Sequence, residues 1–224
     1  MRSNGEFASK WEERLRDPAY VAEMEAAEKR RKEKAAAELE KAQRRHLERM
    51  ELPERPLRLI LAGAATKSQA VEALERPWSL LVMSGRPGTG KTLAACLWLA
   101  RYVQDAKNWE EDTFRFKGSA VFLTAERLSR WSRYDDAAME KLYKAKRLVL
   151  DDLGVEYLDE KGAYASILDA LIDARYSSMR PTILTTNLTG QAFKERYGER
   201  IADRLRDEGS LFVALGQTSM RRKP

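Results

Sequence analysis

The chain has 224 residues, enough for one substantial α/β domain and an appendage. Its one cysteine and one histidine exclude a disulfide framework, a zinc ribbon and most histidine-based catalysis, and Cys96, in an apolar stretch, is expected to be a small buried hydrophobe. The net charge of +6 permits nucleic-acid contact but does not require it. The sequence has no apolar run of about 18 residues and no signal-peptide core, so we expect a cytoplasmic protein that does not enter a membrane.

The first 52 residues differ in composition from the rest of the chain. Between Trp11 and Glu51, Glu, Lys, Arg and Ala dominate, glycine is missing, and Pro18 is the only proline. This pattern predicts a short helix, a break at Asp17-Pro18, and a long helix from about Ala19 to Met50. We therefore expect a charged helical arm at 1–52 and a separate main domain at 53–224.

The arm carries few apolar side chains. Phe7, Trp11 and Leu15 are four residues apart and would share one helical face. The apolar stripe that continues along the long helix is thin and can bury little area. The arm is expected either to lie on the main domain or to bind a partner, while residues 30–45 are equally consistent with a solvated charged helix.

From Pro53 onward, helical and strand patterns alternate. The expected strands are 79–84, 119–124, 147–152, 181–186 and 211–214, and the expected helices are 57–62, 69–74, 92–100, 163–178 and 192–206. Continuous apolar strands that alternate with helices indicate a parallel sheet covered on both faces. The expected fold is a three-layer α/β domain with a five-stranded parallel sheet, and a ligand at the carboxyl ends of its strands.

Residues 85–92 satisfy the pattern G-x-x-x-x-G-K-[ST] of a phosphate-binding loop. The predicted nucleotide-binding residues are Gly85, Arg86, Pro87, Gly88, Thr89, Gly90, Lys91 and Thr92. The glycines let backbone N–H groups turn inward around phosphates, Lys91 reaches the β- and γ-phosphates, and the Thr92 hydroxyl ligates Mg²⁺. A glycine-rich turn without a ligand is the alternative, but it would not need the strand before the loop and the helix after it. The chain is therefore predicted to bind a nucleoside triphosphate.

The third expected strand ends in Leu148-Val149-Leu150-Asp151-Asp152-Leu153-Gly154, a Walker-B pattern. Asp151 emerges at the strand end and is expected to hold the Mg²⁺ shell, whereas Asp152 is expected to orient or deprotonate the attacking water. Acidic turn residues often end a strand without any function. The position of this strand after the phosphate-binding loop favours the functional interpretation.

The fourth expected strand ends in Thr185-Thr186-Asn187. The Asn187 amide would lie beside the γ-phosphate and help to position the water. The alternative is a helix cap for the segment that starts at Thr189. The place of this strand end beside the Walker-B strand favours a role for Asn187 in the site.

Arg200 and Arg204 are four residues apart and share a helix face. They either form surface salt bridges with Glu199, Asp203 or Asp207, or Arg204 is an arginine finger that enters the ATP site of a neighbouring subunit.

The best candidate for DNA contact is Arg127–Tyr134. Arg130 and Arg133 could hold phosphates while Trp131 or Tyr134 stacks on bases, as in proteins that bind single strands. Packing of Trp131 against the sheet edge is an equally consistent alternative.

These residues resemble the AAA+ helicase-loader family of bacteria and phages (DnaC- and DnaI-like proteins) and the related IstB-like transposition ATPases. The resemblance covers about 53–222 and rests on the phosphate-binding loop, the Walker-B strand, Arg-Pro-Thr-Ile-Leu-Thr-Thr-Asn, Gly-Glu-Arg-Ile-Ala-Asp-Arg-Leu and the terminal Ser-Met-Arg. It implies an ASCE-type AAA+ ATPase that assembles side by side and binds ATP and Mg²⁺.

The resemblance also implies roles for individual residues. Asn187 matches sensor 1, Arg200 and Arg204 match box VII with Arg204 as the finger, and Arg221 matches sensor 2, although Met220 replaces the usual Tyr before it. Lys91 and Asp152 complete the implied catalytic set. Because Asp152 is one methylene shorter than the Glu that most such ATPases use, we expect slow hydrolysis.

Three functions are consistent with these features. A helicase loader would grip the replicative DNA helicase with residues 1–52 and form a homo-oligomer on ATP and single-stranded DNA. A transposition ATPase would oligomerise on duplex DNA with a transposase as its partner. A small-molecule P-loop kinase would transfer the phosphate to a metabolite, but it would have no role for Asn187 or for the pair Arg200 and Arg204. Residues 1–52 carry 13 Lys/Arg and 12 Asp/Glu, and this near-neutral arm suits a protein partner better than phosphates, which favours the loader.

Overall fold

The computed structural model describes residues 14, 16–64, 67–156 and 163–216, with the backbone alone at 131–134. It divides into two units, residues 1–43 and 44–224. The long helix α2 (Pro18–Arg49) begins at the expected break. Proline is favoured at a first helical position, and the Asp17 carboxylate accepts the Ala19 N–H at 2.9 Å. The last turns of α2 belong to the second unit, where Leu47 is fully buried.

The second unit is built on five parallel strands. These are β1 (Leu80–Ser84), β2 (Ala120–Thr124), β3 (Arg147–Leu153), β4 (Thr182–Thr186) and β5 (Ser210–Ala214). Their order in the sheet is β2-β3-β4-β1-β5, so β4 separates the strand that leads into the phosphate-binding loop from the Walker-B strand. Ser84 pairs with Thr186, so β1 and β4 end at the same level and deliver the loop and Asn187 side by side.

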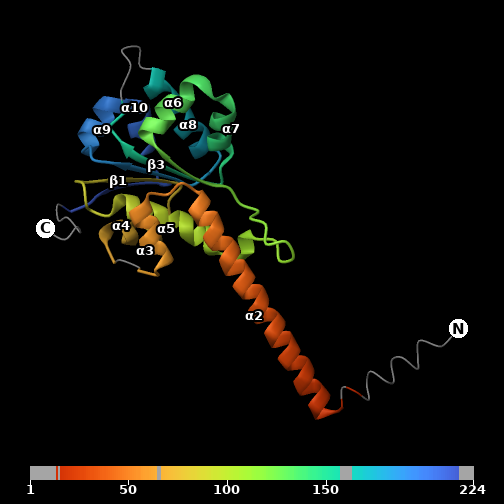
Figure 1. Ribbon diagram of the computed structural model, residues 1–224. Coiled ribbons are helices and arrows are strands. Elements are labelled where there is room, and N and C mark those ends of the chain that lie inside the picture. Colours follow the sequence, from red (N-terminus) through yellow and green to blue (C-terminus); the bar gives the residue numbers. More distant parts are fainter. Residues whose placement is uncertain (1–13, 15, 65–66, 157–162, 217–224) are drawn as a thin grey trace. The chain divides into compact units, whose positions relative to one another are not determined.

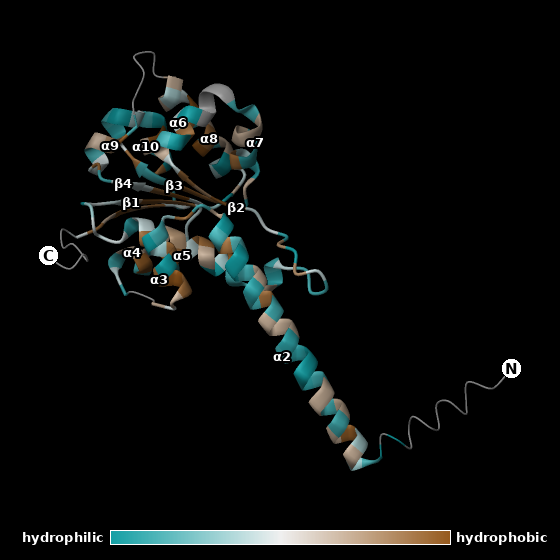
Figure 2. Ribbon diagram, viewed as in Figure 1, coloured by the Kyte–Doolittle hydropathy of each residue, from teal (hydrophilic) through white to brown (hydrophobic). Residues whose placement is uncertain are grey.

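Helices cover both faces of the sheet (Figure 1). The first group is α3 (Glu54–Leu61), α4 (Gln69–Glu72), the 3-10 turn η1 (Ala73–Glu75) and α5 (Lys91–Gln104), followed by η2 (Ala106–Asn108). The opposite face carries α6 (Ala125–Tyr134), α7 (Asp136–Lys144), α8 (Ala163–Ser177), α9 (Gly190–Tyr197) and α10 (Glu199–Arg204). In Figure 2 the strands are predominantly hydrophobic between more hydrophilic helices, and every residue of β1 and β4 is buried. The expected three-layer α/β fold with a five-stranded parallel sheet is confirmed.

Two parts of the second unit differ from the expectation. The single helix expected at 192–206 is two helices, because Gly198 adopts a φ of 94° between α9 and α10. The helices α6 and α7 were not predicted, although Asp135 caps α7 by accepting the Ala138 N–H at 2.8 Å, a signal present in the sequence. Among the described helices, none combines the length and apolar character needed to cross a membrane.

Candidate nucleotide-binding site

The phosphate-binding loop joins β1 to α5 at the carboxyl edge of the sheet. Gly88 and Gly90 both have a φ of 90°, a left-handed conformation that glycine adopts without strain. Gly90 is the N-cap of α5, which begins at Lys91. The unsatisfied N–H groups of this 14-residue helix therefore border the loop, and such a helix start favours a bound anion.

Lys91 is buried within this loop. Its ammonium Nζ donates to the carbonyl oxygens of Gly85 at 2.6 Å and Arg86 at 3.1 Å, and to Asn187 Oδ1 at 3.0 Å. Burial lowers the pKa of Lys91, while the nearby charges of Asp152 and Asp151 act in the opposite direction. The three acceptors are uncharged, so the ammonium can exchange them for the anionic oxygens of a phosphate.

Asp151 and Thr92, the two residues expected to bind Mg²⁺, lie in contact with each other. The Thr92 hydroxyl lies 3.0 and 3.1 Å from the two carboxylate oxygens of Asp151. Burial raises the pKa of Asp151, and the hydrogen bonds donated by Thr185 and Thr92 oppose this shift. A carboxylate and a hydroxyl fit Mg²⁺, which takes oxygen ligands and keeps several positions for water and phosphate.

Asp152 lies on a bulge of β3. The pairing of β3 with β4 shifts between Leu150 and Leu153, and Asp152 has a φ of 62°. Among residues other than glycine, Asp and Asn tolerate this region best, which is a physical reason for Asp rather than Glu at this place. Asn187 Nδ2 donates to Asp152 Oδ1 at 3.2 Å, so Asn187 touches both Lys91 and Asp152.

Thr185 is a site residue that we did not predict. This buried side chain donates from Oγ1 to Asp151 Oδ1 at 2.6 Å and accepts the backbone N–H of Asp152 at 2.9 Å. One hydroxyl therefore holds the carboxylate of Asp151 and the backbone of Asp152. The available signal was a polar residue inside an apolar strand, but its partners lie on another strand and depend on the bulge.

The arginine pair lies on α10 and faces α8. Arg204, with 15% of its side chain exposed, donates to Asp169 Oδ1 at 3.0 Å and pairs with Asp173, while Arg200 pairs with Asp169 Oδ2 at 3.2 Å. Ion pairs thus exist within the subunit, but not with the partners we considered. Those acids interact with other residues: Glu199 pairs with Lys194, Asp203 pairs with Arg206, and Asp207 accepts a hydrogen bond from Tyr176. The trans role of Arg204 stays a prediction.

The other predicted residues are described only in part. Cys96 is buried as expected, and burial raises the pKa of its thiol. The candidate DNA-binding segment belongs to α6, where Arg130 is 69% exposed and pairs with Glu126 at 3.4 Å. The predicted residues that lie outside the described part of the chain are Phe7, Trp11, Leu15, Met220 and Arg221. For Trp131, Arg133 and Tyr134 the structure describes the backbone alone.

Comparison with known proteins finds relatives of this chain among the replicative helicase loaders. The chain is 30% identical over 164 residues to the replicative helicase loader DnaC of Escherichia coli K12, a match that covers 68% of this chain and 60% of that protein. A DnaC of Buchnera aphidicola subsp. Baizongia pistaciae is 29% identical over 153 residues. The chain thus spans about three fifths of the length of these relatives, at 60% and 56%. No family model matches the chain.

Solved structures show the same fold. A DnaC helicase loader structure matches with a TM-score of 0.53 at 20% identity, over 73% of this chain and all of that one. A DnaI structure matches with a TM-score of 0.50 at 20% identity, over 68% and 81% of the two chains. The initiator DnaA bound to AMPPCP and single-stranded DNA reaches 0.50 at 18% identity, over 67% and 45%. With its P-loop AAA+ fold and these relatives, the chain belongs to the DnaC-like helicase-loader family.

Proposed function

We propose that this protein binds ATP with Mg²⁺, hydrolyses it slowly, and uses this cycle to load a replicative DNA helicase onto single-stranded DNA. The observation that carries the ATPase part is the convergence of five side chains at one edge of the sheet. They are Lys91, Thr92, Asp151, Asp152 and Asn187. The loader part is supported by relatives that are replicative helicase loaders.

Each residue has a task that follows from its chemistry. Lys91 supplies positive charge to the β- and γ-phosphates, and Asp152 and Asn187 orient the attacking water. Thr92 and Asp151 would hold Mg²⁺, which when bound neutralises phosphate charge. The described residues contain no group of three or more His, Cys, Asp or Glu side chains that could hold a metal. Two protein ligands agree with the usual Mg²⁺ site, which takes further oxygens from phosphates and water.

Asp152→Asn tests the catalytic assignment. Asn tolerates the φ of 62° at this position, so the substitution removes the carboxylate charge without straining the bulge. We expect nucleotide affinity to be unchanged and ATP turnover to fall by about 10²-fold, within the usual range for loss of a general base. Phosphate release at saturating ATP measures turnover, and Asp203→Asn, at an exposed ion pair, is the matched control. Full turnover in Asp152→Asn would remove this residue from the mechanism.

Arg204 is proposed to complete the site of a neighbouring subunit in an ATP-dependent homo-oligomer. Arg200 and Arg221 would bind the nucleotide from box VII and sensor 2. Arg204→Ala should then bind ATP normally and hydrolyse it poorly, with partial recovery on mixing with Asp152→Asn subunits. A purely structural ion pair with Asp169 and Asp173 predicts instead a lower melting temperature and unchanged turnover of the protein that remains folded.

The arm is proposed to bind the helicase, because its near-neutral charge suits a protein surface. A deletion should end at Gln43, since Leu47 and Leu52 are buried in the second unit and their loss would damage the ATPase domain. We expect the chain that starts at Arg44 to bind ATP and lose helicase binding. Trp11→Ala in the full chain should weaken that binding at least tenfold, about 1.4 kcal/mol. A shortened chain that captures the helicase with full affinity would contradict this role of the arm.

The loading step itself separates helicase loader from transposition ATPase. A circular single strand with an annealed oligonucleotide, the replicative helicase and this protein should give helicase-dependent displacement of the oligonucleotide in the presence of ATP. The Lys91→Ala variant should not support it, although ATP is still present for the helicase. Stimulation of a transposase on duplex DNA with no effect on the helicase would favour the alternative.

The substitution Arg130→Ala, at an exposed position of α6, should weaken binding to single-stranded DNA and reduce the salt dependence of that binding if α6 contacts phosphates.

A further inference from the structure

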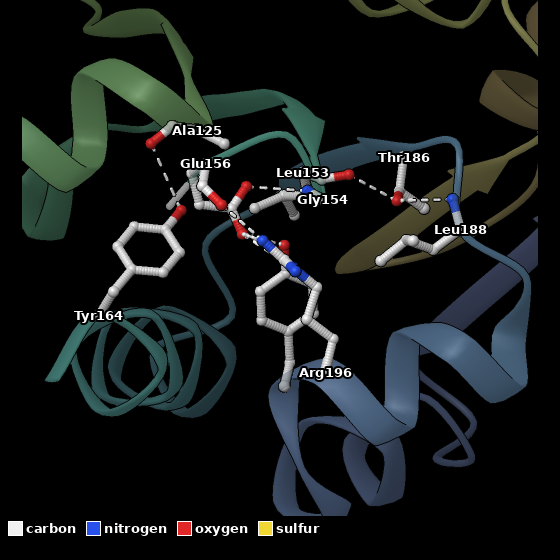
Figure 3. A network of polar contacts seen from close by, with 9 residues as sticks. Ala125, Leu153, Gly154, Glu156, Tyr164, Thr186, Leu188 and Arg196 are labelled. Carbon is white, nitrogen blue, oxygen red and sulfur yellow. Dashed lines mark hydrogen bonds and ion pairs between the residues drawn. The ribbon is translucent and has the colours of Figure 1, made fainter. Parts of the chain in front are cut away.

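A buried carboxylate follows the Walker-B strand and is not used by the site described above. Glu156 is 3% exposed. Its Oε2 accepts the backbone N–H of Gly154 at 2.8 Å. Its Oε1 accepts the hydroxyl of Tyr197 and lies 3.3 Å from Nε and Nη2 of Arg196. Figure 3 shows Glu156 between the end of the Walker-B segment and Arg196.

The two oxygens of Glu156 hold two different parts of the molecule. Gly154 lies two residues after Asp152, so the first oxygen fixes the loop that leaves the nucleotide site. Tyr197 is the last residue of α9, and Gly198 directly after it turns the chain into α10 with a φ of 94°. The second oxygen therefore fixes the joint from which α10 and Arg204 project.

The bonding at Glu156 fits a permanent bridge. Burying a carboxylate is costly unless it is paired and hydrogen-bonded, and Glu156 has a guanidinium, a hydroxyl and an amide as donors. Arg196 also donates to the Glu156 carbonyl oxygen at 2.5 Å. Burial and the hydrogen bond to Glu156 raise the pKa of Tyr197, so the phenol stays protonated and can donate.

The other end of α9 is attached to the same site. Ser84, at the end of β1, donates from Oγ to the Leu188 carbonyl at 2.5 Å. Thr186 accepts the Leu188 N–H at 3.1 Å and donates to the Leu153 carbonyl at 2.7 Å, as Figure 3 also shows. Because α9 is tied to the site strands at its start and to the Walker-B loop at its end, a movement of that loop is transmitted to α10.

We propose that Glu156 is a positioning residue, which aligns Arg204 for the neighbouring subunit by fixing the α9–α10 joint to the Walker-B loop of its own subunit. This inference rests on the proposed trans role of Arg204. It makes Glu156 necessary in the subunit that donates the finger and dispensable in the subunit whose ATP is hydrolysed. A bridge that only stabilises the fold would affect both subunits equally.

The test is a mixing experiment with two inactive proteins. Arg204→Ala has an intact site and no finger, while Asp152→Asn has a finger and an inactive site, so ATP turnover after mixing reports the finger of one on the site of the other. Glu156→Gln is then added to either partner. We expect recovery to fall about tenfold or more when Glu156→Gln is in the Asp152→Asn partner, since a displacement of ~1 Å can cost about 10²-fold. In the Arg204→Ala partner it should leave recovery unchanged.

Two controls keep the result interpretable. Glu195→Gln changes an exposed carboxylate on the same helix, bonded to Gln191 at 2.7 Å, and should leave recovery unchanged in either partner. If Glu156→Gln does not fold, Tyr197→Phe removes only the hydroxyl branch to the joint and should show the same asymmetry. Melting temperatures of all variants verify folding.

The outcomes separate the two hypotheses. If Asp152→Asn and Arg204→Ala form mixed oligomers, shown by cross-linking, without recovering turnover, the trans finger is wrong, and the proposal for Glu156 falls with it. If they recover turnover and Glu156→Gln acts equally in both partners, in the Arg204→Ala partner alone, or in neither, the finger stands and Glu156 does not position it.

Discussion

Two buried cations lie at opposite ends of the parallel sheet, and their surroundings differ. At the carboxyl end, Lys91 donates to two loop carbonyls and an amide oxygen, close to two carboxylates. At the other end, Arg175 is 1% exposed, and burial lowers its pKa to about 10, so it stays charged at neutral pH. Its partners are the Leu142, Ala145 and Pro181 carbonyls and the Thr182 hydroxyl, at 2.6 to 3.1 Å.

The comparison indicates how a buried cation that is proposed to bind a ligand differs from one that supports the fold. The acceptors of Arg175 belong to the end of α7, the approach to β3 and the start of β4, which are fixed by the sheet. Those of Lys91 belong to the phosphate-binding loop and an exposed side chain, Asn187, and a ligand can replace them. Convergent carboxylates, Asp151 and Asp152, mark the binding end. Substitution should therefore destabilise the fold at one end and abolish binding at the other.

Arg175→Met should have the largest effect on stability. It leaves the carbonyls of Leu142 and Ala145 without the guanidinium donor, and buried unsatisfied acceptors cost about 1–3 kcal/mol each. The Pro181 carbonyl loses one of its two donors and keeps the Leu148 N–H. We expect the free energy of unfolding to fall by about 4 kcal/mol or more, measured by urea denaturation. Arg175→Lys keeps the charge but not the fork of donors and should give an intermediate loss. A fully stable Arg175→Met protein would contradict the structural role.

Lys91→Ala should have the opposite profile. Nucleotide affinity is expected to fall at least about 100-fold, near 3 kcal/mol, because the phosphates lose a buried positive charge. Without nucleotide, the free energy of unfolding should be unchanged or higher, since the native state no longer buries an ammonium among uncharged acceptors. Titration with a fluorescent ATP analogue measures the affinity, with exposed Lys67→Ala as control. Equal affinity of Lys91→Ala and wild type would overturn the site assignment.

Thr185→Val sharpens the comparison at the carboxyl end. Valine keeps the β-branched shape but cannot bond to Asp151 or to the Asp152 N–H, so the bulge should lose its fixed geometry. We expect ATP turnover to fall about tenfold, equal to about 1.4 kcal/mol in the barrier, with a smaller loss of nucleotide affinity. Thr185→Ser keeps the hydroxyl and should recover most of the turnover. Equal rates for Val and Ser would show that the hydroxyl has no part in catalysis.

Motif and periodicity were enough to predict the parallel sheet, the phosphate-binding loop and the place of Asp151, Asp152 and Asn187. These features depend on local patterns and on the rule that parallel strands end at one edge. The bulge at Asp152, the bridge at Glu156 and the ion pairs of Arg204 with Asp169 depend on which helix faces which strand. Such pairings join residues distant in sequence, and no spacing in the chain indicates them.

The smallest expected effect concerns a half-buried basic group, the single histidine. His46 packs on Phe116 and Trp109, with ring centroids 4.5 and 5.8 Å apart. Burial, and secondarily the charge of Arg49, lower its pKa. The folded state therefore favours neutral imidazole, and the unfolded chain binds more protons as the pH falls through about 6.5, the ordinary pKa of histidine.

Unlike Arg175 and Lys91, which lie among oxygen acceptors, His46 packs half-buried against aromatic rings, and we expect it to keep this place by losing its proton. The contribution of His46 to the free energy of unfolding should be fully present above about pH 6.5 and should decline below that pH. We expect the melting temperature to fall by an amount on the order of 2 °C. His46→Phe retains a ring against Phe116 and Trp109 without a titratable group, so the difference in melting temperature between the two proteins isolates the histidine from other groups that titrate. A difference that stays constant from pH 7.5 to about 5.5, on either side of the ordinary histidine pKa, would mean that the folded protein accepts imidazolium as readily as imidazole. His46 would then belong with the two cations.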